Sequence, residues 1–172
     1  MELHMRSHRW DARAPDWTAA VAAGFVAGAV LMVLELLWTT NLMGATPWTI
    51  PHKIAAIVMG PEVARTHDFS IAVVGVALVT HYVLGIVFGL ILAAVMAPFR
   101  FDSSLGMAVA VGAVFGLLLY LLNFYAMARA FPWFIDLRGW PNLIGHLIFG
   151  MSAAFMYWKL EGARSSARID AL

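Results

Sequence analysis

The stretch FSIAVVGVALVTHYVLGIVFGLILAAVMA, residues 69–97, contains no Asp, Glu, Lys or Arg. A helix of about 20 apolar residues is long enough to cross the hydrocarbon core of a bilayer, so this stretch predicts a transmembrane helix. Three further apolar segments predict the same, and they cover residues 17–43, 105–128 and 141–158. None of the four shows the alternation of apolar and polar residues typical of barrel strands. The sequence therefore predicts an all-α polytopic membrane protein with four transmembrane helices.

The composition agrees with this class. Hydrophobic residues make up 62% of the 172 residues and charged residues 12%, whereas soluble domains have about 45–50% and about 25%. The chain has no cysteine, which excludes disulfides, zinc–thiolate sites, iron–sulfur clusters and thiol catalysis. A formal net charge of +1 gives no indication of nucleic-acid binding. The sequence also lacks the P-loop, nucleophile-elbow and zinc-protease motifs, so we expect a protein that is not an enzyme.

The polar segments divide the chain into four parts. Residues 1–16 form an N-terminal tail, 17–97 a first helical hairpin, 98–160 a second hairpin and 161–172 a C-terminal tail. The first hairpin has a long outer loop, residues 44–68, which holds a short helix expected at the membrane interface. Pro51 is expected to begin this helix, and Gly60 with Pro61 to end it.

Basic residues predict the orientation, because loops on the cytoplasmic side carry more Lys and Arg. The side that holds both termini and the 97–104 link carries seven Lys or Arg, and the opposite side carries four. We therefore expect a multi-pass membrane protein with both termini in the cytoplasm.

An internal repeat is indicated by two hexamers. ATPWTI at residues 45–50 returns as AFPWFI at residues 130–135, with four identical positions. The helices around them match in spacing as well: Gly24, Gly28 and Glu35 with Gly112, Gly116 and Asn123, and His81, Gly85 and Gly89 with His146, Gly150 and Ala154. The pattern predicts two tandem two-helix hairpin repeats, related by an axis along the membrane normal. In each repeat the proline is expected to end the helix and the tryptophan to lie at the headgroup level.

Small residues predict which helix faces pack, because they let helix backbones approach closely in lipid. The glycines expected at such contacts are Gly24, Gly28, Gly85, Gly89, Gly112, Gly116 and Gly150. Four intramembrane polar residues share these faces: Glu35, His81, Asn123 and His146. We therefore expect a polar cluster inside the outer half of the bundle. An ionised side chain in hydrocarbon is costly, so Glu35 must be protonated, hydrogen-bonded or near water, with His81 or His146 as its expected partner.

Several roles for this cluster stay open. The histidines and Asn123 suit interhelical hydrogen bonds, worth about 0.6–2 kcal/mol each. His81 and His146 on separate helices also meet the residue requirement for axial ligation of one haem b. Glu35 with both histidines could hold a metal ion, although no spacing demands one, or could relay protons. His52 and His67, which flank the extra segment within the outer loop, are expected to be solvated and not to act as ligands.

A family resemblance is carried by short motifs in a shared order. Val79-Thr80-His81 followed by Ile86-Val87-Phe88, and Gly145-His146 at the start of the last span, resemble YagU-type bacterial inner-membrane proteins. The small-residue start of the first helix, Gly24 to Gly28, is similar too, and the resemblance covers about residues 20–158. It implies a poorly characterised inner-membrane protein, one member of which has been linked to acid resistance, and it implies no catalytic residues. The chain departs from the family at Glu35, where the family has a basic residue.

Together these patterns predict a non-enzymatic membrane protein, either a small transport or stress-related factor or an accessory subunit of a membrane complex. Its expected partners are the lipid bilayer and a larger complex or further copies of itself, and no nucleic acid. A haem-binding electron carrier and a proton-responsive or proton-conducting protein are the alternatives.

Overall fold

The computed structural model describes residues 13–169. Most of the predicted N-terminal tail (1–12) and the last three residues (170–172) lie outside the described residues. Described residues form no strands, and five α-helices follow one another: α1 (Trp17–Asn41), α2 (Thr49–Met59), α3 (Ile71–Phe99), α4 (Leu105–Leu121) and α5 (Trp140–Ile169). Four short helical turns lie between them: η1 (Val63–Arg65), η2 (Leu122–Ala126), η3 (Met127–Arg129) and η4 (Pro132–Leu137).

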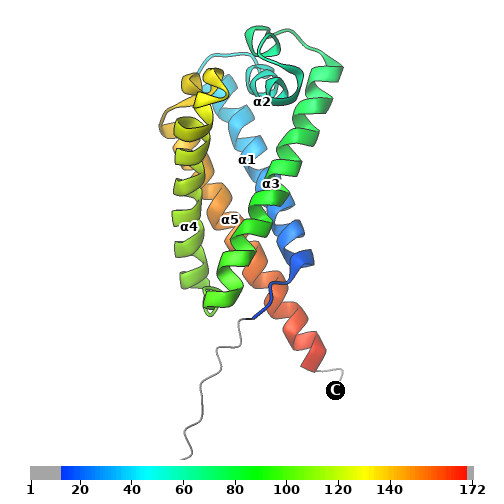
Figure 1. The fold of residues 1–172 in the computed structure, drawn as a ribbon, viewed down its shortest axis with the longest axis vertical. Coiled ribbons are helices and arrows are strands. Elements are labelled where there is room, and N and C mark those ends of the chain that lie inside the picture. The colour runs from blue at the N-terminus through cyan, green and yellow to red at the C-terminus, as the bar shows by residue number, and fades with distance from the viewer. Residues whose placement is uncertain (1–12, 170–172) are drawn as a thin grey trace, which may run out of the picture.

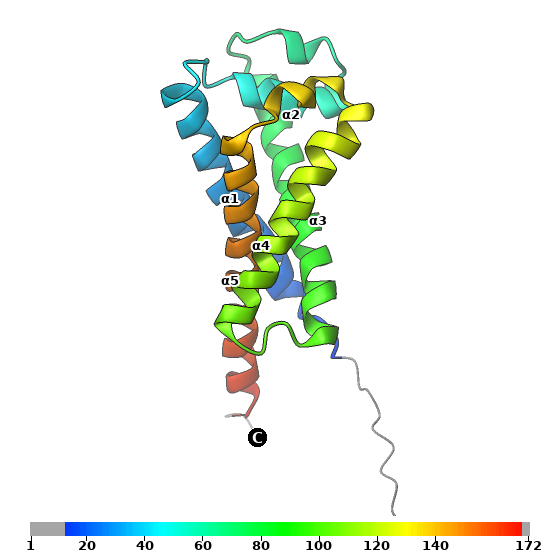
Figure 2. The same cartoon turned by 90° about the vertical axis from the view of Figure 1, so that its left-hand side faces the viewer.

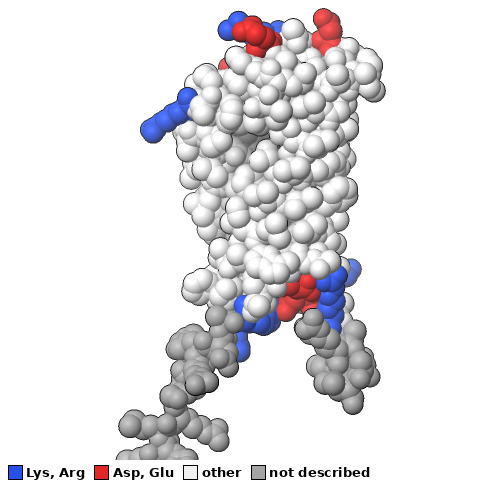
Figure 3. All heavy atoms as spheres, turned by 45° about the vertical axis from the view of Figure 1, so that its right-hand side comes forward, with Lys and Arg blue, Asp and Glu red and all other residues white. Residues whose placement is uncertain are grey.

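Four helical segments are long and apolar enough to cross a membrane: Trp17–Asn41, Ile71–Phe99, Leu105–Arg129 and Trp140–Arg164. This finding confirms an all-helical protein with four candidate membrane spans. Figure 3 shows charged side chains gathered towards the two ends of the molecule, with a wide uncharged band between them. The last helix continues well past the predicted end at Trp158, so most of the segment 161–172 is helical.

The ends of the helices follow from local sequence. Asp16, Ser70 and Ser104 precede α1, α3 and α4, and each side chain accepts a hydrogen bond from a backbone N–H in the first turn. Gly60 ends α2 with a φ of 102°, a conformation that side chains rarely adopt. The prolines of the repeated hexamers act differently from the prediction. α1 ends at Asn41, well before Pro47, and Pro132 begins η4 instead of ending a helix.

Helix packing is uneven around the bundle. α1 packs on α3, α4 on α5, and α1 on α5, whereas α3 and α4 make few contacts. Figure 1 shows α3 and α4 close together at the end where the chain termini lie and diverging towards the end that carries α2. The backbone N–H and C=O groups of a membrane helix are hydrogen-bonded within that helix. α3 and α4 can therefore diverge in lipid without leaving these groups unpaired.

Glycines make the close contacts within each pair. A Cβ atom added to Gly24 would lie 2.9 Å from Ile86 Cα, and one added to Gly89 would lie 2.7 Å from Gly24 Cα. In the other pair, a Cβ atom on Gly112 would lie 2.8 Å from Ala154 Cβ. The remaining predicted packing glycines, Gly28, Gly85, Gly116 and Gly150, also face the neighbouring helix of their pair. Larger side chains would force these helices apart.

The short helix of the outer loop is an integral part of the fold. Figure 2 shows α2 running crosswise to the long helices at the end of the bundle. It buries Ile50, His52, Lys53, Ala55 and Ala56. The expectation of a solvated His52 is therefore wrong: the residue is 1% exposed and its Nδ1–H donates to the Trp48 carbonyl at 2.8 Å. This hydrogen bond within the first turn of α2 replaces water for one ring nitrogen.

Candidate functional site

A cavity of about 370 Å³ lies between α3 and α4, below α2. Its walls come from α1, α2, α3, α5 and the segment that runs from α4 through η4. The structure brings all four predicted polar residues into this lining: Glu35, His81, Asn123 and His146. The remaining lining is apolar and includes five phenylalanines: Phe88, Phe124, Phe131, Phe134 and Phe149. An apolar cavity with a few convergent polar groups is the usual form of a small-molecule site.

The cavity opens sideways. Leu84 of α3, Leu122 of η2 and Met127 of η3 line it and are 37%, 43% and 39% exposed. These three side chains lie where α3 and α4 have diverged, within the apolar band. In a bilayer this mouth would face acyl chains, not water.

A second cavity, of about 230 Å³, lies between α1, α2 and α3. Glu35, His81, Ile50 and Ile54 line both cavities, so the two spaces are neighbours. Glu35 and His81 therefore stand at the junction of the two apolar spaces.

His146 is held by two hydrogen bonds. Its Nδ1 lies 2.8 Å from the Asn142 carbonyl oxygen, and its Nε2 lies 3.1 Å from Asn123 Nδ2. A carbonyl can only accept, so Nδ1 carries the proton and Nε2 accepts from the Asn123 amide. Asn142 is fixed in turn, since its Nδ2 donates to the Leu137 carbonyl at 2.7 Å. The second histidine of the predicted pair is thus locked by its neighbours.

His81 has a different arrangement. Its Nε2–H donates to the carbonyl oxygen of Gly28 at 2.9 Å. Gly28 has no side chain, and its Cα lies where the imidazole ring comes close to α1. The edge of the Tyr82 ring packs at 5.7 Å between ring centroids. His81 is only half-buried, and its Nδ1 makes none of the hydrogen bonds found among the described residues.

Glu35 is the residue of the polar cluster whose carboxyl has no hydrogen-bond partner among the described residues. It is half-buried, and within residues 13–169 its carboxyl accepts no hydrogen bond and has no ion-pair partner within 4.0 Å. It interacts through space with His81. The expected hydrogen bond from a histidine to Glu35 is therefore not formed, because His81 donates to the Gly28 carbonyl and His146 is paired with Asn123.

The chain leaves α-helical geometry where Asn123 enters the cavity. Residues Leu122–Ala126 form one π-helical turn, a feature that is frequent at functional sites. Arg138 Nε donates to the Phe124 carbonyl at 2.7 Å, and its guanidinium lies 4.4 Å from the centre of the Tyr125 ring. The LNFYA sequence contains no proline or glycine that would have revealed this turn.

The second hexamer fastens α2 over the cavity. Trp133 Nε1 donates to the Lys53 carbonyl at 2.9 Å, and Lys53 Nζ lies 2.7 Å from Asp136 Oδ2. The Lys53 side chain is 9% exposed and that of Asp136 70%. Trp133 of the second hexamer and the neighbouring Asp136 therefore hold Lys53 of α2, a contact that the matching sequences did not predict.

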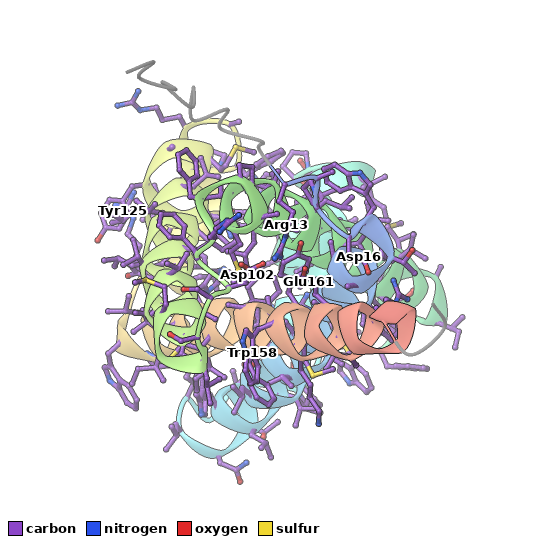
Figure 4. All side chains as sticks on the ribbon, turned by 90° about the horizontal axis from the view of Figure 1, so that it is seen from below. Arg13, Asp16, Asp102, Tyr125, Trp158 and Glu161 are labelled. Atoms are coloured by element: carbon purple, nitrogen blue, oxygen red, sulfur yellow. The ribbon has the colours of Figure 1, made fainter. Side chains whose placement is uncertain are left out.

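At the opposite end, a charged network joins the chain ends to the bundle (Figure 4). Arg13 pairs with Asp102, and with Glu161 at 2.5 Å, while Asp16 pairs with Arg164 at 2.6 Å. Partial burial acts to lower the pKa of Arg13, but the charges of Asp102 and Glu161 outweigh it and raise that pKa. Partial burial likewise acts to raise the pKa of Asp16, but the Ala19 N–H and Arg164 lower it overall. Sequence reasoning missed this network because its members lie far apart in the chain.

The hydrogen bonds of His81 and His146 affect whether these residues could hold the haem or the metal ion considered from the sequence. Haem ligation uses an imidazole nitrogen with a free lone pair. His81 keeps one at Nδ1 because Nε2 carries the proton, but His146 has none, since its Nδ1 carries a proton and its Nε2 accepts from Asn123. Over the described part of the chain, no three His, Asp or Glu side chains are grouped as a metal site. The arrangement as it stands therefore fits neither the haem pair nor the three-ligand metal site.

No family model matches the chain, and comparison with curated proteins and with solved structures gives no significant match.

Proposed function

We propose that this chain is a multi-pass protein of the bacterial inner membrane, with cytoplasmic termini, that binds a lipophilic small molecule without catalysing a reaction. It would act as a small transport or stress-related factor, alone or as an accessory subunit of a larger complex. The observation that carries the proposal is the cavity of about 370 Å³, whose lining includes the exposed side chains of Leu84, Leu122 and Met127 where α3 and α4 diverge. The resemblance to YagU-type proteins supports the stress-related role.

The packing of the bundle favours a binding site over a proton path. The half of the bundle away from α2 is filled by a core that includes Ala20, Ala23, Leu92, Met96 and Ala153, each at most 1% exposed. Close-packed apolar side chains leave no room for a chain of water. The polar residues that line the cavity therefore lead into the bundle from one side and do not continue across it.

The tandem repeat forms part of the proposal, and equivalent contacts support it. Gly24 faces the backbone of Gly85 as Gly112 faces that of Gly150, and Gly28 faces His81 as Gly116 faces His146. The two hairpins are not joined symmetrically, however. α1 packs on α5 while the equivalent pair, α4 and α3, diverges. This departure from twofold symmetry is what opens the cavity.

The test is labelling by an uncharged aryl diazirine in lipid nanodiscs, with modified residues identified by mass spectrometry. Phe134 and Phe149 line the cavity and are 9% and 3% exposed. A diazirine that cannot pass from the bilayer into the cavity would therefore leave them unlabelled. We expect both to be modified, while the equally buried Met96 in the packed core stays unmodified.

A pair of variants supplies the control. Leu122→Trp narrows the mouth, whereas Leu118→Trp places the same ring on an exposed position of α4 outside the cavity lining. Labelling of Phe149 should fall in the first variant and persist in the second. Absence of label at Phe134 and Phe149 in the unmodified protein would refute the proposed function.

A further inference from the structure

The charge inside the two cavities comes from a single side chain. Of the residues that line them, Glu35 alone is an Asp, Glu, Lys or Arg, and it lines both spaces. Lys53, the one Lys or Arg of α2, is engaged elsewhere, since its Nζ pairs with Asp136 at 2.7 Å. Neither cavity therefore supplies a cationic side chain to balance this carboxyl.

Each of the other polar side chains that line the larger cavity has a hydrogen-bond partner, although His81 Nδ1 has none within the described residues. The Asn123 amide and His146 bond to each other, and the His81 Nε2–H is taken by the Gly28 carbonyl. A ligand that enters the larger cavity would thus find Glu35 as the one polar side chain with no hydrogen-bond partner in the described part of the chain, and that side chain is acidic. An unpaired carboxyl inside a membrane is expensive to retain and is a functional residue by default.

Aromatic rings line both cavities that Glu35 also lines. Five phenylalanines line the larger cavity and Trp48 lines the smaller one. The faces of aromatic rings attract cations, and quaternary ammonium groups are bound by such cages in many proteins. A carboxylate together with aromatic walls repels anions and selects a positive charge on an apolar body.

We propose that the ligand is a lipophilic cation, such as a quaternary ammonium or phosphonium ion with aryl or alkyl groups. Its charge is balanced by Glu35 and its apolar groups lie among the phenylalanines. This inference rests on the proposed function, because it names the ligand class of the same cavity. The mouth between α3 and α4 admits such an ion from the bilayer, where lipophilic cations concentrate.

The experiment is equilibrium dialysis of the protein in nanodiscs against tetraphenylphosphonium and against tetraphenylborate, ions of the same shape and opposite charge. Binding to empty nanodiscs is subtracted, and only the saturable part is compared. We expect saturable binding of the phosphonium ion and none of the borate. Equal saturable binding of both ions would overturn the inference.

Variants of Glu35 test whether its charge is needed for phosphonium binding. Glu35→Gln keeps the side-chain shape and should weaken phosphonium binding by about tenfold or more, since removing the charge removes an interaction of at least that size. Glu35→Asp should retain part of the binding. Glu62→Gln, on an exposed residue at η1 outside both cavities, is the matched control and should bind as the unmodified protein does.

The diazirine experiment distinguishes a failure of the cation inference from a failure of the proposed function. If Phe149 is labelled but the phosphonium ion shows no saturable binding, or Glu35→Gln binds it unchanged, the cavity is accessible and the cation inference is wrong. If Phe149 is not labelled in the unmodified protein, the proposed function itself fails. Labelling of Phe149 in Glu35→Gln at the unmodified level also shows that this variant is folded.

Discussion

Asn123 donates a hydrogen bond to His146 across 3.1 Å, whereas Glu35, at the matching position of the proposed repeat, makes no such bond to His81. The first-hairpin histidine donates to the Gly28 carbonyl instead. Matching positions have thus taken different roles. The Asn123–His146 pair joins η2 to α5, and the Glu35 carboxyl is left lining the two cavities.

Replacing Asn123 should lower the unfolding free energy, because it removes the hydrogen bond to His146. Asn123→Leu leaves Nε2 of a histidine that is 5% exposed without its donor, which should cost about 1–3 kcal/mol of unfolding free energy. Denaturant titration in detergent measures this, and a double-mutant cycle with His146→Phe should show non-additive effects. The same substitution at exposed Asn41, whose amide bonds only within its own helix, should change stability by less than about 0.5 kcal/mol. Additive effects at Asn123 and His146 would contradict the pairing.

Enlarging Gly116 should separate α4 from α5. A Cβ atom there would lie 2.8 Å from the backbone carbon of His146, so Gly116→Ala should destabilise the protein by about 1–3 kcal/mol through overpacking. Gly106 lies in the same helix and a Cβ atom there meets nothing within 4 Å. Gly106→Ala should therefore be neutral or stabilising. Thermal unfolding in detergent compares the two, and equal melting temperatures would show that this glycine contact is not tight.

The contact between α2 and η4 should respond to loss of one charge. Asp136→Asn leaves the Lys53 ammonium, whose side chain is 9% exposed, without its counter-charge. We expect faster hydrogen exchange of the α2 amides in this variant, and recovery in the double variant Lys53→Met/Asp136→Asn, because the unpaired buried charge is then gone. The exposed pair Arg65–Glu62 is the comparison, and Glu62→Gln should leave α2 exchange unchanged. Failure of the double variant to recover would indicate that the Lys53 ammonium has another essential role.

The charged network predicts a loss of stability in acid. The pKa of Asp16 is lowered in the folded protein, by the Ala19 N–H and Arg164 acting against burial. Its contribution is therefore present above the unfolded pKa, about 3.9, and is lost as the pH falls through the lower folded value. Between about pH 5 and about pH 3, unfolding free energy should fall more for the unmodified protein than for Asp16→Asn. Equal slopes for the unmodified protein and Asp16→Asn would contradict this prediction.

Much of the helical framework was predictable from residues close together in the chain. Runs such as residues 69–97 must be helical in lipid, since every backbone N–H and C=O needs a partner within its own segment. Glycine spacing also identified the faces that pack, because positions four residues apart lie on one side of a helix. Those faces carry His81 and His146, and so the sequence alone indicated which polar residues would line the interior.

The tertiary structure decided the rest. The divergence of α3 from α4, the π-helical turn at Leu122–Ala126 and the burial of His52 depend on which helices meet, and no local pattern encodes that. The same holds for the Arg13–Asp102 pair, which joins residues 89 positions apart. Charge pairing and packing across such separations are settled only when the whole bundle is assembled, because each depends on the simultaneous fit of several helices.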